Sequence, residues 1–149
     1  PMLRGSLVHE AIQLATVQPG CNLRQEVQIM VAELATSGAI SPEASAVLVD
    51  PLQVQALADR AKSMFDLGME GVAEVIECEQ RRAMVLPGTK KWLHGIPDAV
   101  VRMEDGRVAV IEYKTTSTGK DLVKVADRYR SSPQVHLYAA LVQRGTLTL

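Results

Sequence analysis

The sequence is poor in aromatic residues and cysteines, and it lacks a long hydrophobic run. Aromatic residues make up only 3% of the 149 residues, so the core must be built from aliphatic side chains and methionine. The two cysteines, Cys21 and Cys78, cannot form a disulfide framework or a four-thiolate metal site, and we expect them to be reduced, as in a cytoplasmic protein. No stretch of about 18 apolar residues predicts a membrane span. The chain runs straight into a helical pattern, so we expect no signal peptide.

The charge is nearly balanced overall but unevenly distributed along the chain. The net charge is -1, which argues against a protein that binds polyanions over its whole surface. Residues 1–80 hold 4 basic and 11 acidic residues, whereas residues 81–149 hold 12 basic and 6 acidic residues. A basic second half can attract phosphate groups if its cations share one face, although halves of a sequence need not be faces of a fold.

The length and the periodicity of the apolar residues predict one folded domain, residues 1–149, with a helical first half. Asn22 and Ser41 are helix-capping residues, and Pro42 and Pro51 suit the first position of a helix. Residues 18–70 are thus expected to be a helical segment within the domain. Helices are predicted over residues 4–17, 22–36, a short stretch from Ser41, and 52–67, with Gly68 ending the last.

The second half has the pattern of strands followed by helices. Extended structure is predicted over residues 74–86, 92–103, 107–113 and 146–149, and helices over 120–129 and 134–143. This order predicts an α/β or α+β fold with a small mixed β-sheet flanked by helices.

Asp105-Gly106 marks a hairpin whose register decides which side chains meet. With a three-residue loop, Glu104-Asp105-Gly106, and the glycine in the left-handed conformation, Asp98 pairs directly with Glu112. Side chains alternate along a strand, so Lys114 then shares the face of Glu112 and Asp98. A two-residue loop would instead turn Asp98 away. We predict the three-residue loop, with both faces of the strand pair covered by other parts of the fold.

Two carboxylates and a lysine at the end of a hairpin can hold a hard divalent cation and polarise a water molecule. Carboxylates flanked by Ile, Val and Ala need a partner when they are buried. A metal ion is one such partner for Asp98 and Glu112. Lys114 alone is the other, and would make the cluster a structural ion pair.

Three motifs resemble those of a known family. Pro97-Asp98 and Glu112-Tyr113-Lys114 resemble the two halves of the PD-(D/E)xK nuclease signature. The stretch from Gly5 to His9 resembles the amino-terminal Gly-x-x-x-His helix of the RecB-like branch, and the stretch from Gln134 to Tyr138 resembles its Gln-x-x-x-Tyr motif. The three motifs occur in the family's order and span nearly the whole chain.

The resemblance implies a restriction-endonuclease-like three-layer core and a metal-dependent deoxyribonuclease, with a RecB-like exonuclease favoured. Asp98, Glu112 and Lys114 would be catalytic. Metal ligands for Mg²⁺ or Mn²⁺ would be His9, Asp98, Glu112 and the carbonyl of Tyr113, and Gln134 and Tyr138 would lie near the substrate. The partner would be DNA, without a membrane, in a homo-oligomer or a larger recombination or repair complex. The chain would be a stand-alone nuclease, of the kind found in phages and mobile elements, or an excised nuclease domain.

The chain departs from some relatives, and other interpretations stay open. Cys21 and Cys78 do not match the iron–sulfur relatives, so no such cluster is expected. Alternative functions are a non-catalytic nucleic-acid-binding or scaffolding domain, a structure-specific endonuclease and a ribonuclease.

Several other residues are expected to have ordinary structural roles. Glu77 and Glu79 are interpreted as solvent-facing strand residues, and Trp92 as buried. His94 and His136 are not assigned to the site. The basic residues around Trp92, and those between 120 and 130, are either a rim for DNA or solvated surface.

Overall fold

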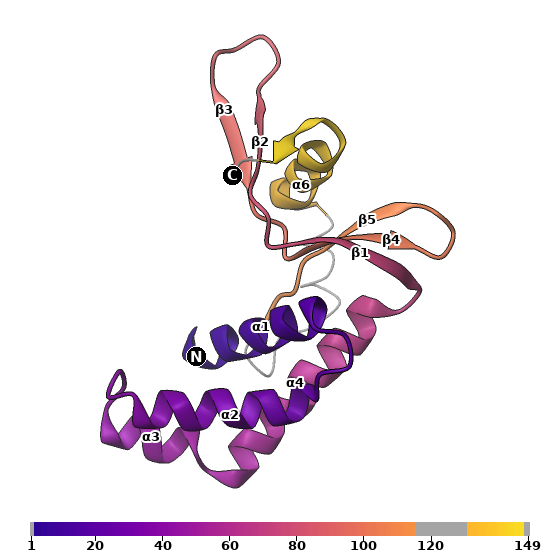
Figure 1. Cartoon of the computed structure of the whole chain (residues 1–149). Coiled ribbons are helices and arrows are strands. Elements are labelled where there is room, and N and C mark those ends of the chain that lie inside the picture. Colours follow the sequence, from indigo (N-terminus) through magenta and orange to yellow (C-terminus); the bar gives the residue numbers. More distant parts are fainter. Residues whose placement is uncertain (1, 116–130, 148–149) are drawn as a thin grey trace. The chain divides into compact units, whose positions relative to one another are not determined.

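The computed structural model describes residues 2–115 and 131–147, which form two compact units (Figure 1). The first unit covers residues 1–70 and the second covers residues 71–149. The predicted helix over residues 120–129 and its basic side chains lie outside the described residues.

The described part of the first unit is a group of four helices, and capping residues mark the starts of three of them. The side chains of Asn22, Ser41 and Asp50 accept hydrogen bonds from backbone N–H groups of the first turns. Pro42 and Pro51 each occupy a first helical position. The helices are α1 (Met2–Val17), α2 (Leu23–Thr36), α3 (Pro42–Leu48) and α4 (Pro51–Met69). Contrary to expectation, Gly68 does not end α4, which runs one residue further.

The core of the first unit lies where α1, α2 and α4 pack against one another. Five apolar residues on one face of α1 are buried. Helix α4 contributes small residues, which let neighbouring helices approach closely. The buried apolar side chains are Leu7, Val8, Ala11, Ile12 and Ala15 of α1, Leu23, Val27 and Val31 of α2, and Leu57, Ala58 and Ala61 of α4.

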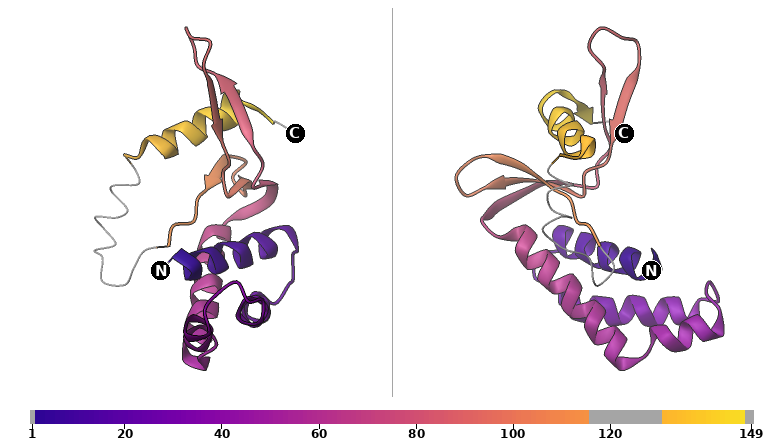
Figure 2. Two further views of the ribbon diagram at one scale, coloured as in Figure 1. Left: turned by 90° about the vertical axis from the view of Figure 1, so that its left-hand side faces the viewer. Right: turned by 180° about the vertical axis from the view of Figure 1, so that it is seen from behind.

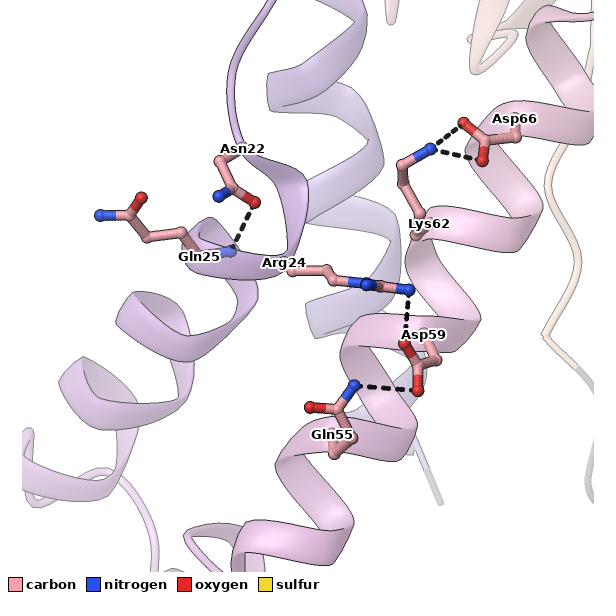
Figure 3. A network of polar contacts seen from close by, with 7 residues as sticks. All are labelled: Asn22, Arg24, Gln25, Gln55, Asp59, Lys62 and Asp66. Atoms are coloured by element: carbon pink, nitrogen blue, oxygen red, sulfur yellow. Dashed lines mark hydrogen bonds and ion pairs between the residues drawn. The ribbon is translucent and has the colours of Figure 1, made fainter.

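Polar contacts on the surface add to this packing (Figure 3). Arg24 of α2 forms an ion pair of 2.9 Å with Asp59 of α4, which also accepts a 2.9 Å hydrogen bond from Gln55. Lys62 and Asp66 pair one turn apart along α4. About half of each of these charged side chains is exposed, so each pair contributes less than about 1 kcal/mol.

The described strands of the second unit form two three-stranded antiparallel sheets rather than the single mixed sheet that the sequence predicted. One sheet has the order β1-β4-β5 and the other has the order β3-β2-β6. The strands are β1 (Val72–Cys78), β2 (Arg82–Val85), β3 (Trp92–Gly95), β4 (Ala99–Met103), β5 (Val108–Ile111) and β6 (Thr146–Leu147).

Strands β1 to β4 form one long hairpin that bends at its middle (Figure 1). One arm consists of β1 and β2, and the other consists of β3 and β4. Cys78 pairs with Ala99 in the first sheet and Arg82 pairs with Gly95 in the second, so one register continues through both sheets. Between them the N–H of Glu79 donates to the carbonyl of Asp98 over 3.1 Å. The extended segments 74–86 and 92–103 were therefore correctly located, but each is two strands and not one.

Both arms of the bend carry a residue that a regular ladder does not accommodate. Glu79 is the only described non-glycine residue with a positive φ, at 48°. Pro97, on the opposite arm, has no N–H to donate to a neighbouring strand. The periodicity of apolar residues indicates extended backbone but not interruptions in strand pairing. It therefore did not predict the break at these two residues.

A buried ion pair crosses the bend. Glu77 of β1 accepts two hydrogen bonds from the guanidinium of Arg82 of β2, one of them 2.9 Å long, and both side chains are less than 15% exposed. Arg82 also donates to the carbonyls of Leu141 and Gly145 at the end of α6 (Pro133–Arg144). A cation there complements the free carbonyls of the helix terminus. The expectation that Glu77 faces solvent was wrong.

Helix α6 lies alongside the β2–β3 part of the hairpin, as both views in Figure 2 show. Gly95 makes this close approach possible. A Cβ atom at Gly95 would lie 2.7 Å from side-chain atoms of both Leu141 and Tyr138. Leu141 is fully buried. The contact therefore fixes the position of Tyr138 relative to β3.

The mixed helix-and-strand fold class is confirmed, with helices concentrated in the first half of the chain. A three-layer arrangement would require the two units to be placed together, and it remains a prediction. Among the described residues, no helix combines the length and the apolar character that crossing a membrane requires.

The Arg82–Glu77 pair gives a test of what stabilises the bend. Replacing Arg82 by Ala leaves the Glu77 carboxylate buried without its partner and should lower the free energy of unfolding by about 3–5 kcal/mol. The double variant Glu77→Leu/Arg82→Leu removes both charges and should lose much less. Urea unfolding of the three proteins measures both effects, and equal losses in the single and double variants would contradict this role.

Candidate active site

The hairpin β4–β5 has the predicted three-residue loop. Ala99 lies opposite Ile111, and Met103 donates to the carbonyl of Arg107 over 2.8 Å. Gly106 has the left-handed conformation that the loop requires, with φ at 83°. Continuing the register by one residue beyond Ala99 and Ile111 sets Asp98 opposite Glu112.

The expectation that both strands of this hairpin are covered holds for β4 only. Ala99, Val100 and Val101 are buried, as suits the central strand of the sheet. Strand β5 is the terminal strand over the described residues, and its Val108 is half-exposed. The site thus lies at the end of one buried strand and one terminal strand, where a substrate can approach.

Asp98 sits at the bend of the long hairpin, directly before β4. Its Oδ2 accepts a hydrogen bond of 2.6 Å from the N–H of Tyr113. Its carbonyl accepts from the N–H of Glu79 on the other side. Asp98 is therefore held from both neighbouring strands, and its carboxylate stands beside the backbone that follows β5.

Glu112 follows β5 directly, and 17% of its side chain is exposed. Its Oε1 forms an ion pair with Lys114 and accepts a 2.9 Å hydrogen bond from the side-chain amide of Gln134. Its Oε2 is buried and has no hydrogen-bond partner among the described residues. The ion pair expected as the alternative to a metal is present, but it occupies only one of the two oxygens.

The Gln134 and Tyr138 pair on α6 reaches this carboxylate. The amide nitrogen of Gln134 donates to Glu112 and lies 3.1 Å from the hydroxyl of Tyr138, one turn further along the helix. Ser132 caps the helix and Pro133 starts it. The spacing of four residues thus places Gln134 and Tyr138 on one face of α6. The close contact of Tyr138 with Gly95 brings that face against β3.

Tyr113 lies between Glu112 and Lys114 in sequence and points away from them, as alternation predicts. Its ring is buried and its hydroxyl has no hydrogen-bond partner among the described residues. Burial, and then the charges of Asp98 and Cys78, raise the pKa of Tyr113 to about 12. The phenol is therefore neutral and serves the packing of the site.

His9, His136 and Glu79 are the other residues that the sequence analysis considered. His9 is half-buried on α1 and belongs to the first unit, whereas the two carboxylates and Lys114 belong to the second. His136 is exposed, as expected. Glu79 is exposed and flanks Asp98 through its backbone.

The carboxylate oxygens of Asp98 and Glu112 are suitable ligands for a hard divalent cation. Throughout residues 2–115 and 131–147, no three His, Cys, Asp or Glu side chains gather into a metal site. The second unit offers two carboxylates on adjacent strand ends, and the buried, unpartnered Oε2 of Glu112 is the kind of oxygen that such a cation binds. Oxygen donors of this type suit Mg²⁺ and Mn²⁺.

Comparison with protein families matches the model of the PD-(D/E)XK nuclease superfamily over residues 1–149. The chain belongs to the PD-(D/E)XK nuclease superfamily. Comparison with curated proteins gives no significant match, and comparison with solved structures gives none either. Membership indicates a nuclease with a nucleic-acid substrate, in a superfamily that generally uses divalent metal ions.

One neighbour of Asp98 was not predicted from the sequence. Cys78 pairs with Ala99, next to Asp98, and burial followed by the charges of Glu79 and Asp98 raises the pKa of its thiol. A raised pKa favours the neutral thiol over the thiolate. The only signal in the sequence was the register of the long hairpin, which depends on the bend.

Replacing Tyr113 by Phe should stabilise the protein. The change removes a buried hydroxyl that has no partner among residues 2–115 and 131–147, so the free energy of unfolding at neutral pH should rise by about 1 kcal/mol. Because the folded pKa of about 12 exceeds the ordinary value of 10, wild-type stability should fall as the pH rises from 10 towards 12. That fall should be smaller in the variant.

Denaturant unfolding across this pH range measures both effects. Tyr138→Phe is the matched control, because its hydroxyl contacts Gln134 and its removal should not stabilise. A loss of stability in Tyr113→Phe at neutral pH would show that its hydroxyl has a partner after all.

Proposed function

We propose that this protein is a metal-dependent nuclease that hydrolyses DNA phosphodiester bonds, and that it acts as a RecB-like exonuclease. The observation that supports it best is Glu112, whose Oε1 is paired and whose buried Oε2 has no hydrogen-bond partner among the described residues. A buried carboxylate oxygen without a partner is unfavourable unless a cation offsets it. Family membership makes a divalent metal ion the natural choice.

The proposed metal ligands are Asp98, Glu112, the carbonyl of Tyr113 and His9. A bound Mg²⁺ or Mn²⁺ would polarise a water molecule and offset charge on the phosphate. The hydrogen bond from the N–H of Tyr113 to Asp98 fixes this stretch of backbone against the carboxylate. The role of His9 rests on the resemblance of its motif alone.

Lys114 is the proposed catalytic cation. About a third of its side chain is exposed, so its ammonium group can reach both Glu112 and a phosphate group in solvent. An ammonium group beside the reacting phosphate stabilises the charge that develops as water attacks the phosphorus. It also orients that water by hydrogen bonding.

Gln134 is proposed as a positioning residue that also lies near the substrate together with Tyr138. Its amide holds Oε1 of Glu112, which leaves Oε2 directed elsewhere. Its second contact, with the Tyr138 hydroxyl, fixes the amide in that orientation. A carboxylate held in this way does not need to reorganise when the reaction begins.

The alternative of a non-catalytic nucleic-acid-binding domain is supported by the Lys114–Glu112 ion pair, which already offsets one charge. A structure-specific endonuclease or a ribonuclease would use the same residues on another substrate. Metal binding separates the first alternative from the nuclease, and cleavage of defined substrates separates the others.

Metal binding is expected to depend on Glu112. Mn²⁺ at 100 times its dissociation constant should raise the free energy of unfolding by about 2.7 kcal/mol. Glu112→Gln, which keeps the shape but removes the charge, should lose most of that gain. Calorimetric titration and denaturant unfolding measure it directly.

Glu74→Gln is the matched control for this change. Glu74 is an exposed carboxylate on β1 that pairs with Arg102, away from the strand ends. It should retain full metal stabilisation. Equal metal stabilisation in the Glu112 and Glu74 variants would remove the main support for the proposal.

Cleavage is expected to depend on Lys114. Lys114→Ala should lower the rate constant of DNA cleavage by about 100-fold or more, because the cation near the phosphate is lost, while metal binding persists. Lys62→Ala, at the exposed ion pair on α4, is the control and should cut at the wild-type rate. The rates are measured on linear and circular DNA with Mg²⁺, Mn²⁺ or a chelator.

The comparison of linear with circular DNA tests the exonuclease assignment separately. Cutting of linear DNA alone supports an exonuclease, and nicking of closed circles would replace it with an endonuclease. Metal-dependent cutting at an unchanged rate in Lys114→Ala would contradict the role of that lysine.

A further inference from the structure

Trp92 is the only tryptophan of the chain, and it is exposed on the β2–β3 hairpin. Its side chain is 60% exposed, which corrects the expectation that it is buried. Its ring stacks on that of His94, with the centroids 6.2 Å apart and an angle of 25° between the planes. Trp92 is therefore held in place from one side while much of its surface remains open to solvent.

The surroundings of Trp92 combine apolar surface with positive charge. Residues 80–95 contain four basic residues and no acidic residue, and three of the four, all except the Glu77-paired Arg82, are exposed. Lys90 and Lys91 directly precede Trp92, and both are exposed. A hollow of about 310 Å³ adjoins the ring and is lined by Ala83, Met84, Val85, Pro87, Trp92 and Arg144.

We propose that this surface binds an unpaired stretch of single-stranded DNA, with a base stacked on Trp92. An exposed aromatic ring beside basic groups matches the two parts of a nucleotide, because the ring stacks on the base and the cations attract the phosphates. In a duplex both faces of each base are already stacked, so only an unpaired base presents a free face to Trp92. The inference rests on the proposed function in that it names the form of its substrate.

The position of Trp92 relates this surface to the cleavage site. Five residues lie between Trp92 and Asp98, and even a fully extended chain of six residue steps spans only about 20 Å. Stacked nucleotides advance about 3.4 Å each along one strand. A strand of about six nucleotides would therefore reach from the ring to the carboxylates, so the surface would bind the substrate strand upstream or downstream of the cut.

Trp92 provides its own signal for the test, because base stacking quenches tryptophan fluorescence. The full chain is titrated with oligodeoxythymidylates of 2 to about 12 nucleotides in a chelator, so that no cleavage occurs. We expect quenching by single-stranded DNA, tightening up to a length of about six nucleotides, and little quenching by a blunt duplex. Equal quenching by the duplex would overturn the inference, as would tighter binding of the matching oligoribonucleotide.

Variants separate stacking from general charge attraction. Anisotropy of a labelled oligonucleotide should show about 5- to 150-fold weaker binding for Trp92→Ala, and binding close to wild type for Trp92→Phe. Leu52→Ala, which removes an exposed apolar side chain on α4, is the control and should change nothing. Wild-type affinity in Trp92→Ala would overturn the inference.

The results also separate this inference from the proposed nuclease. Quenching by single-stranded DNA without any metal-dependent cutting would support the binding surface and contradict the nuclease. Cutting without quenching, at the same rate in wild type and Trp92→Ala, would support the nuclease and contradict the binding surface.

Discussion

The bend in the long hairpin is the constraint on which the site depends. Without the bend, β1 to β4 would form one continuous pair of strands, and Asp98 would be a regularly paired strand residue. The break at Glu79 and Pro97 removes Asp98 from regular pairing, and its carboxylate accepts instead from the backbone of Tyr113. The same bend directs the β2–β3 part towards α6, from which Gln134 reaches Glu112. The ion pair of Glu77 with Arg82, which crosses the bend, stabilises the bent hairpin.

The site follows a simple electrostatic logic. Glu112 has two carboxylate oxygens, and the described residues supply donors for only one of them. A fully satisfied carboxylate would be more stable but would have no capacity left for a cation. Leaving Oε2 buried and unpartnered lowers the stability of the fold, and functional sites are where such a loss is expected.

The sequence predicted local features well because each depends on a few neighbouring residues. The caps at Asn22 and Ser41, the loop ending in Gly106 and the facing pair on α6 are of this kind. The bend was missed because it arises from pairing between distant segments, with Glu79 donating to Asp98. The exposure of Trp92 was missed for a related reason: a scarce aromatic residue is usually needed in the core, whereas here aliphatic and small side chains fill it.

A nuclease site must reconcile two opposite demands, because carboxylates are needed to hold metal ions and a polyanion must approach them. The second half of this chain separates the two along one hairpin. The acidic pair lies at the ends of β4 and β5, while the segment from 80 to 95 has no acidic residue and presents the exposed Arg81, Lys90 and Lys91. In the proposed enzyme a strand would be held first by the basic hairpin, where phosphates are attracted, and its scissile bond would then meet the carboxylates only where Lys114 and a cation offset their repulsion. The balanced net charge of the whole chain does not reveal that acidic and basic groups occupy different parts of this hairpin. The positions of the strands reveal it.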